Sequence, residues 1–87
     1  MARVFTTEFL FRSQWLRILV IINDAPEGLI VGIRVFDETA IRILGRESIK
    51  FVGLTGYKTL DVIHNPEALD LLDKIYHSIL DQLNKNP

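Results

Sequence analysis

The chain has 87 residues, of which 48% are hydrophobic and 24% are charged, and its formal net charge is −1. This length suits one domain, residues 1–87, and the hydrophobic share excludes an intrinsically disordered chain. A near-neutral charge is untypical of nucleic-acid-binding domains, and the absence of cysteine excludes disulfides, thiol catalysis and thiolate metal sites.

The beginning of the chain shows no targeting signal. Its early apolar residues are interrupted by Glu8, Arg12 and Arg17, which a secretory signal would not contain. The longest uninterrupted apolar run, 18–22, is far shorter than the ~20 residues that span a bilayer. We therefore expect a cytoplasmic protein that does not enter the membrane.

Residues 1–58 are expected to form an antiparallel sheet. Five segments rich in Ile, Val, Phe and Thr are separated by short clusters of turn-forming residues. Connections this short allow only antiparallel pairing of neighbours, so the prediction is a five-stranded β-meander. The predicted strands are Val4–Arg12, Trp15–Asn23, Leu29–Phe36, Ala40–Leu44 and Ile49–Thr55.

The end of the last predicted strand contains Gly53, Gly56 and Lys58, a composition also found in phosphate-binding loops. A Walker loop, however, has four residues between its first glycine and an adjacent Gly-Lys, and it opens directly into a helix. Here only two residues separate the glycines, and Tyr57 stands before the lysine. The glycines are therefore interpreted as a strand exit.

Residues 59–65 are predicted to connect the sheet to a single C-terminal amphipathic helix over 66–84. Asn65 is a suitable N-cap, Pro66 suits the first helical position, and Glu67 suits the first turn. Apolar residues recur at spacings of three and four, which indicates a helix lying on one sheet face. The stripe contains Leu69, Leu72, Tyr76, Ile79 and Leu83, widened by Ile75 and Leu80. The fold class is therefore α+β.

The pattern of strand residues separates an apolar face from a mixed face. With Phe11 opposite Leu16, and with Ile18 opposite Ile33, one face becomes almost purely apolar, and the helix should cover it. The same register places Arg17 opposite Arg34, Arg34 opposite Arg42, and Arg42 opposite Lys50. This predicts a row of cations across four strands on the uncovered face.

The uncovered face is the candidate site. One helix about 10 Å wide cannot cover five strands that span about 20 Å, and it does not touch the other side of the sheet at all. The candidate residues are Trp15, Arg17, Leu19, Arg34, Phe36, Arg42, Leu44, Lys50 and Val52, with Leu10, Ile21, Ile30 and Leu54 as further apolar members.

Two functions fit such a face, and a solvated face is the third interpretation. The favoured hypothesis is a non-enzymatic binding or assembly module that forms a homo-oligomer, with a dimer favoured, through this face. The acidic helix of a partner could then meet the cation row, and a different protein is a further candidate partner. The alternative is single-stranded nucleic-acid binding, with the cations on phosphates and with Trp15 and Phe36 stacking on bases.

Catalysis is the least favoured function. His64 precedes the helix, His77 lies between Asp73 and Asp81 at helical spacing, and Ser48 has no histidine near in sequence. These positions fit surface electrostatics better than a metal site or an activated nucleophile. The sequence therefore assigns no catalytic, cofactor-binding or metal-binding residue.

Overall fold

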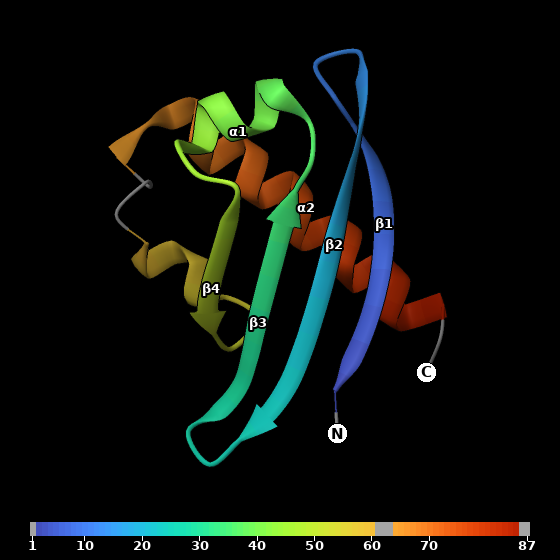
Figure 1. Ribbon diagram of the computed structural model, residues 1–87, viewed down its shortest axis with the longest axis vertical. Coiled ribbons are helices and arrows are strands. Elements are labelled where there is room, and N and C mark those ends of the chain that lie inside the picture. Colours follow the sequence, from blue (N-terminus) through green and yellow to red (C-terminus); the bar gives the residue numbers. More distant parts are fainter. Residues whose placement is uncertain (1, 61–63, 86–87) are drawn as a thin grey trace.

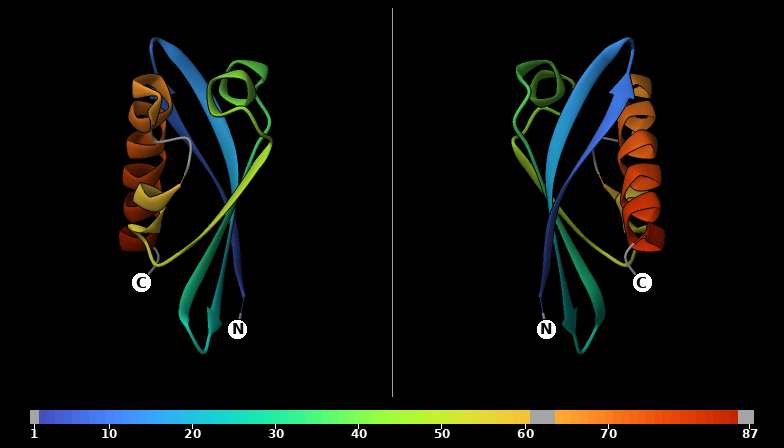
Figure 2. Two further views of the ribbon diagram at one scale, coloured as in Figure 1. Left: turned by 90° about the vertical axis from the view of Figure 1, so that its left-hand side faces the viewer. Right: turned by 90° about the vertical axis from the view of Figure 1, so that its right-hand side faces the viewer.

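The protein is described by a computed structural model that covers residues 2–60 and 64–85. A four-stranded antiparallel sheet, in the order β1-β2-β3-β4, carries helix α2 on one face (Figures 1 and 2). The predicted α+β class, antiparallel sheet and C-terminal helix are confirmed, but the sheet has four strands and not five. The elements are β1 (Arg3–Phe11), β2 (Gln14–Ala25), β3 (Gly28–Val35), α1 (Glu38–Leu44), β4 (Ser48–Val52), the 3₁₀ turn η1 (Gly56–Thr59) and α2 (Pro66–Lys85).

The predicted strand Ala40–Leu44 is wrong, because these residues belong to helix α1. Asp37 caps the helix by accepting a hydrogen bond from the Thr39 amide at 2.8 Å. Gly45 ends it in the left-handed conformation, with its amide donating to the Ile41 carbonyl at 2.7 Å. Ala40 and Leu44, four residues apart, face the core, which a helical period requires and a strand period does not.

The predicted strand register is displaced by two residues in both hairpins. The first hairpin turns at Arg12 and Ser13, whose φ angles of 51° and 67° lie in the left-handed region. A two-residue turn of this kind matches the twist of the strands, and it pairs Phe9 with Leu16. In the second hairpin, Ile18 lies opposite Val35 and not opposite Ile33. A shift of two residues keeps each side chain on its predicted face.

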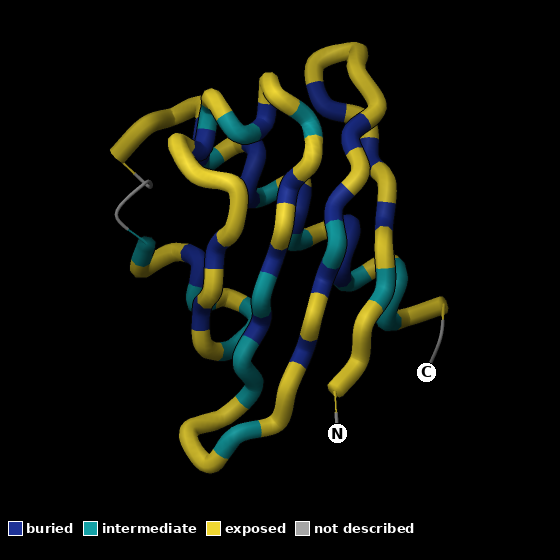
Figure 3. Tube along the Cα trace, in the orientation of Figure 1, coloured by how far each residue is buried: buried dark blue, intermediate teal, exposed yellow. Residues whose placement is uncertain are grey.

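The core lies between α2 and the sheet face that it covers. Buried and exposed residues alternate along the strands, as Figure 3 shows. A buried hydrogen bond of 2.7 Å joins the hydroxyls of Thr7 in β1 and Ser78 in α2. The buried hydrophobic residues are Phe9, Phe11, Leu16, Ile18, Val20, Ile22, Val31, Ile33, Val35, Ala40, Leu44, Ile49, Phe51, Tyr57, Ala68, Leu71, Leu72, Ile75 and Ile79.

Helix α2 begins as predicted and ends one residue later than predicted. The Asn65 side chain caps it by accepting a hydrogen bond from the Glu67 amide at 3.0 Å. Its buried stripe is centred on Leu72, Ile75 and Ile79 but is rotated toward Ala68, so the predicted core residue Leu69 is only half-buried. Part of the predicted connection 59–65 lies outside the described residues.

The chain leaves the sheet after Val52, three residues before the predicted strand end at Thr55. Gly53 turns it away with a φ of 76°, in the left-handed region, in agreement with the interpretation of the glycines as a strand exit. Turn η1 then brings Tyr57 into the core, where its hydroxyl donates to Asp73 of α2 at 2.7 Å. Burial, followed by this hydrogen bond and the Asp73 charge, raises the pKa of Tyr57 from 10.0 to about 12. Asp73 thus ties η1 to α2.

Candidate functional site

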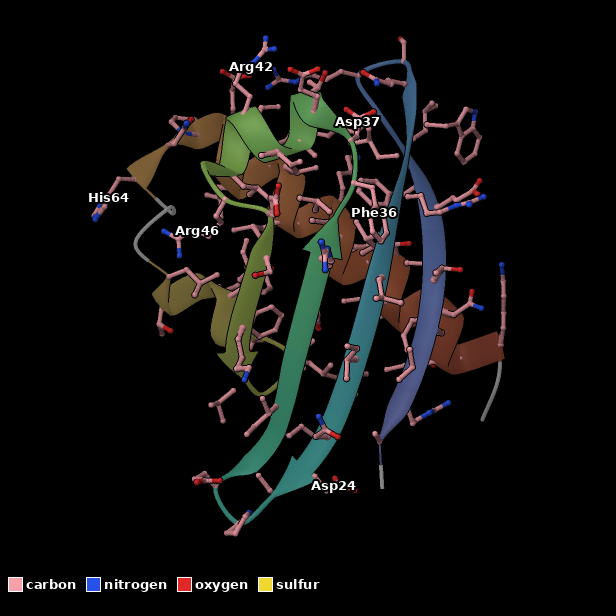
Figure 4. The ribbon with its side chains drawn as sticks, viewed as in Figure 1. Asp24, Phe36, Asp37, Arg42, Arg46 and His64 are labelled. Atoms are coloured by element: carbon pink, nitrogen blue, oxygen red, sulfur yellow. The ribbon has the colours of Figure 1, made fainter. Side chains whose placement is uncertain are left out.

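The candidate site is the sheet face turned away from α2, named here the outer face. Figure 4 looks onto this face, with α2 behind the strands. Each strand contributes alternate residues to it, because side chains of a strand point to opposite faces in turn. Its residues are Val4, Thr6, Glu8 and Leu10 in β1, Trp15, Arg17, Leu19, Ile21 and Asn23 in β2, Ile30, Gly32 and Arg34 in β3, and Ser48, Lys50 and Val52 in β4.

About half of the side chains on the outer face are apolar, and several of these are exposed. Trp15 is 67% exposed and Val52 is 53% exposed, although both are large hydrophobic residues. Phe36, directly after β3, is 54% exposed and lies at the end of the strand nearest α1 (Figure 4). In residues 2–60 and 64–85, the exposed large hydrophobic side chains are these three and Val4, Leu10 and Ile21. All of them belong to the outer face or to its edge.

The predicted cation row does not exist. Arg42 belongs to α1 and points away from the strands (Figure 4), with Glu38 one helical turn earlier at 3.8 Å. Leu44, which was predicted to flank the row, is only 2% exposed and packs in the core. Both residues leave the candidate face because the segment that carries them is helical.

The remaining cations lie in three different rows of the sheet. Arg17 pairs with Glu8 on the neighbouring strand through two hydrogen bonds, the longer of them 3.0 Å. Arg34 lies opposite the apolar Leu19, and Lys50 lies opposite Gly32. The two-residue shift of register therefore replaces the predicted contacts between cations with contacts to neutral or acidic residues.

A hollow of about 370 Å³ opens in the outer face where Gly32 supplies no side chain. Gly32 lies between Ile21 on β2 and Lys50 on β4. The remaining lining residues are Leu19, Ile33, Arg34, Ser48 and Ile49. Two cations, Arg34 and Lys50, therefore line the hollow together with aliphatic residues.

A second, shallower depression lies between Trp15, Arg17, Phe36 and Asp37. Gln14 donates a hydrogen bond to the Asp37 carboxylate at 2.9 Å, which holds the start of α1 to the first hairpin. The structure thus groups the predicted residues Trp15, Arg17 and Phe36 at one end of the outer face. Leu19, Arg34, Lys50 and Val52 lie further along the same face.

Residues that could support chemistry are scattered. Ser48 and His64 are exposed, and His77 forms a hydrogen bond through Nδ1 with the Asp73 carbonyl at 2.7 Å. Within 2–60 and 64–85, no three His, Asp or Glu side chains are placed to share a metal ion. Neither helix in these ranges has the length and hydropathy needed to cross a bilayer.

Five members of the outer face were not predicted from the sequence: Val4, Thr6, Glu8, Asn23 and Ser48. Val4 is 61% exposed beside Ile21, and Glu8 pairs with Arg17. Strand alternation on β1 was the available signal for Val4 and Glu8, because both residues lie an even number of positions from the assigned Leu10.

Comparisons with protein-family models, with curated proteins and with solved structures found no match.

Proposed function

We propose that this chain is a non-enzymatic assembly module that forms a homodimer through the outer face of its sheet. The observation that carries this proposal is the gathering of the exposed large hydrophobic side chains on one face that no described element covers. Monomeric proteins rarely expose a contiguous apolar patch of more than a few hundred Å². A second copy of the chain supplies an identical apolar face.

The size of the face supports a stable dimer. Four strands about 4.8 Å apart span about 19 Å, and the eight residue pairs between β2 and β3 extend about 27 Å. The flat area is about 500 Å², and side-chain relief increases the accessible area. A standard protein interface takes about 800 Å² from each partner. The outer face is therefore of the right order for one such interface.

The arrangement of charges also limits how the copies meet. Packing the outer faces together by a two-fold rotation leaves both α2 helices on the outside. The acidic helix of one copy therefore cannot contact the cations of the other, in contrast to the arrangement expected from the sequence. Counter-charges must come from the outer face itself, where Glu8 is the carboxylate among the residues named above.

Single-stranded nucleic-acid binding is the weaker candidate. It keeps two exposed aromatic residues, Trp15 and Phe36, beside Arg17. Fewer cations than predicted are available to follow a phosphate backbone, because Arg42 lies on α1 and Arg17 pairs with Glu8. Arg34 and Lys50 remain without an ion-pair partner among the described residues.

The test is the mass of the protein in solution against concentration, for the wild type and for Trp15→Ala. We expect a dimer whose dissociation constant rises about 30-fold or more in the variant, since buried aromatic anchors contribute about 2 kcal/mol or more to interfaces. The control is Asp81→Ala, an exposed position on α2, which should leave the dissociation constant unchanged.

Salt separates the two candidates. The outer face carries three cations and one carboxylate, so screening should leave the dimer unchanged or tighten it between about 0.05 and 0.5 M NaCl. Binding of a fluorescent single-stranded DNA oligonucleotide would instead weaken steeply over that range. A wild-type protein that stays monomeric at high concentration, or that binds the oligonucleotide tightly as a monomer, would overturn the dimer proposal.

A further inference from the structure

Gly32 is not required by the fold of a single chain. Its φ is not in the left-handed region, and a Cβ added there would meet its nearest neighbour, the Ile21 carbonyl oxygen, at an ordinary 3.7 Å. Glycine inside a strand costs about 0.5–1 kcal/mol relative to alanine. Such a glycine often marks a bulge, a bend, or a place where a ligand or another backbone approaches closely. The pairing of β3 is continuous on both sides of Gly32, so the glycine does not serve a bulge.

We propose that, in the homodimer, Ile21 of each copy fills the hollow above Gly32 of the partner subunit. This inference rests on the proposed function, and it specifies the arrangement of the two copies. It requires a two-fold axis that runs parallel to the strands, between β2 and β3. Rotation about that axis places β2 of one copy over β3 of the other at the same level along the strands.

The strand register selects the pair. Ile21 and Gly32 are directly opposite each other on β2 and β3, so they lie at one level on either side of this axis. The rotation exchanges their positions and puts each Ile21 above a partner glycine. Ile21 is 37% exposed in the single chain, so its side chain is available. Packed sheets lie about 10 Å apart and interdigitate their side chains, which suits a large residue above a hollow.

The same axis avoids contacts between like charges. Arg34 comes to lie against Leu19 of the partner subunit, since these residues also share a level on β3 and β2. Arg17, one level further along β2, approaches the Phe36 end of β3 of the partner subunit, where a cation can lie on an aromatic ring. A two-fold axis that crosses the strands at the level of Arg34 would instead place two copies of Arg34 together, which is unfavourable.

The arrangement is tested by mixing two variants. Gly32→Val fills the hollow, and Ile21→Ala removes the side chain that enters it. Each should raise the dissociation constant of its own homodimer at least about tenfold. A mixture of the two should form a heterodimer close to wild-type affinity, because one contact is then wild-type and the other joins valine to alanine. Circular dichroism of each variant checks that it remains folded.

A cross-link gives a second readout in a chain that has no cysteine of its own. Ile21→Cys and Gly32→Cys are made in separate, differently tagged chains, mixed and treated with a short bismaleimide that links two thiols. A covalent product of the two different chains is expected, because facing sheets lie about 10 Å apart, which is too far for a direct disulfide but within the span of this reagent. The matched control is Thr39→Cys on α1, an exposed position off the outer face, mixed with Gly32→Cys, which should not cross-link.

The outcomes distinguish this inference from the dimer itself. Rescue by mixing, together with the cross-link between the two different chains, supports the two-fold arrangement. A wild-type dimer in which Gly32→Val binds as tightly as the wild type, or in which mixing gives no rescue, overturns the arrangement and leaves the outer-face dimer standing. A wild-type chain that is monomeric at every concentration overturns both.

Discussion

The buried hydroxyl pair of Thr7 and Ser78 allows a test of how α2 is held on the sheet. Both residues are less than a tenth exposed, and their oxygens are 2.7 Å apart. Ser78→Ala leaves the Thr7 hydroxyl buried in a strand without this partner, which costs about 1–3 kcal/mol. The better helix propensity of alanine returns about 0.5 kcal/mol. We therefore expect a net loss of about 0.5–2.5 kcal/mol in the free energy of unfolding.

The reverse substitution should cost less. Thr7→Val leaves the hydroxyl of Ser78, which can turn to the carbonyl of Lys74 four residues earlier in its own helix. We expect a loss of no more than about 1 kcal/mol. The double variant removes both hydroxyls and should lie within about 0.5 kcal/mol of the wild type, because no buried donor then lacks an acceptor.

The measurement is urea unfolding followed by circular dichroism, at one fixed protein concentration because assembly contributes to stability. Thr39→Val, at an exposed position of α1, serves as the control and should stay within about 0.5 kcal/mol of the wild type. Additive losses, in which the double variant is destabilised by the sum of the two single variants, would refute the reasoning, since coupling is what the hydrogen bond predicts.

Two further predictions concern α1 and Tyr57. Leu44→Ala should lower the free energy of unfolding by about 2–5 kcal/mol, because Leu44 is buried in the core. Arg42→Ala, on the exposed side of α1, should change it by less than about 0.5 kcal/mol. Similar urea midpoints for the two variants would contradict the helical assignment. The raised pKa of Tyr57 means that its stabilising contribution is complete below pH 10 and is lost as the pH rises toward about 12, because the unfolded chain releases this proton first. Tyr57→Phe should make the free energy of unfolding fall less steeply between these pH values. Urea midpoints of both proteins at about pH 9, 10 and 11 measure the difference.

The sequence predicted α2 and the strands β1 to β3 because their signals are strong and local. Helix α2 has a cap, a proline and a long apolar stripe. Helix α1 was missed because Ile41 and Ile43, both β-branched, favour a strand in isolation. Its caps, Asp37 and Gly45, were visible in the sequence but were interpreted as turns. A helix of seven residues carries too short a pattern to outweigh that composition.

The outer face was predicted in composition but not in geometry. Strand alternation has a period of two, so Arg17, Leu19, Arg34 and Lys50 kept their face when the register moved by two residues. The cation row depended on the register itself and was lost. The register of β1 on β2 follows from the turn at Arg12 and Ser13, two residues that rarely adopt positive φ. The pairing of β2 with β3, on which the row depended, follows from the turn at Pro26 and Glu27, since Ala25 lies opposite Gly28. Composition alone does not reveal the length of either turn.

The order of the elements along the chain has a consequence for synthesis. Helix α2 covers strands that were made first, and the contact between Thr7 and Ser78 joins residues 71 positions apart. At about 10 residues per second, a ribosome needs about 7 s to make that stretch. During this time the nascent sheet would have both faces bare. The apolar face that α2 covers therefore stays bare until residues 66–85 emerge, and over that interval it is open to non-specific association.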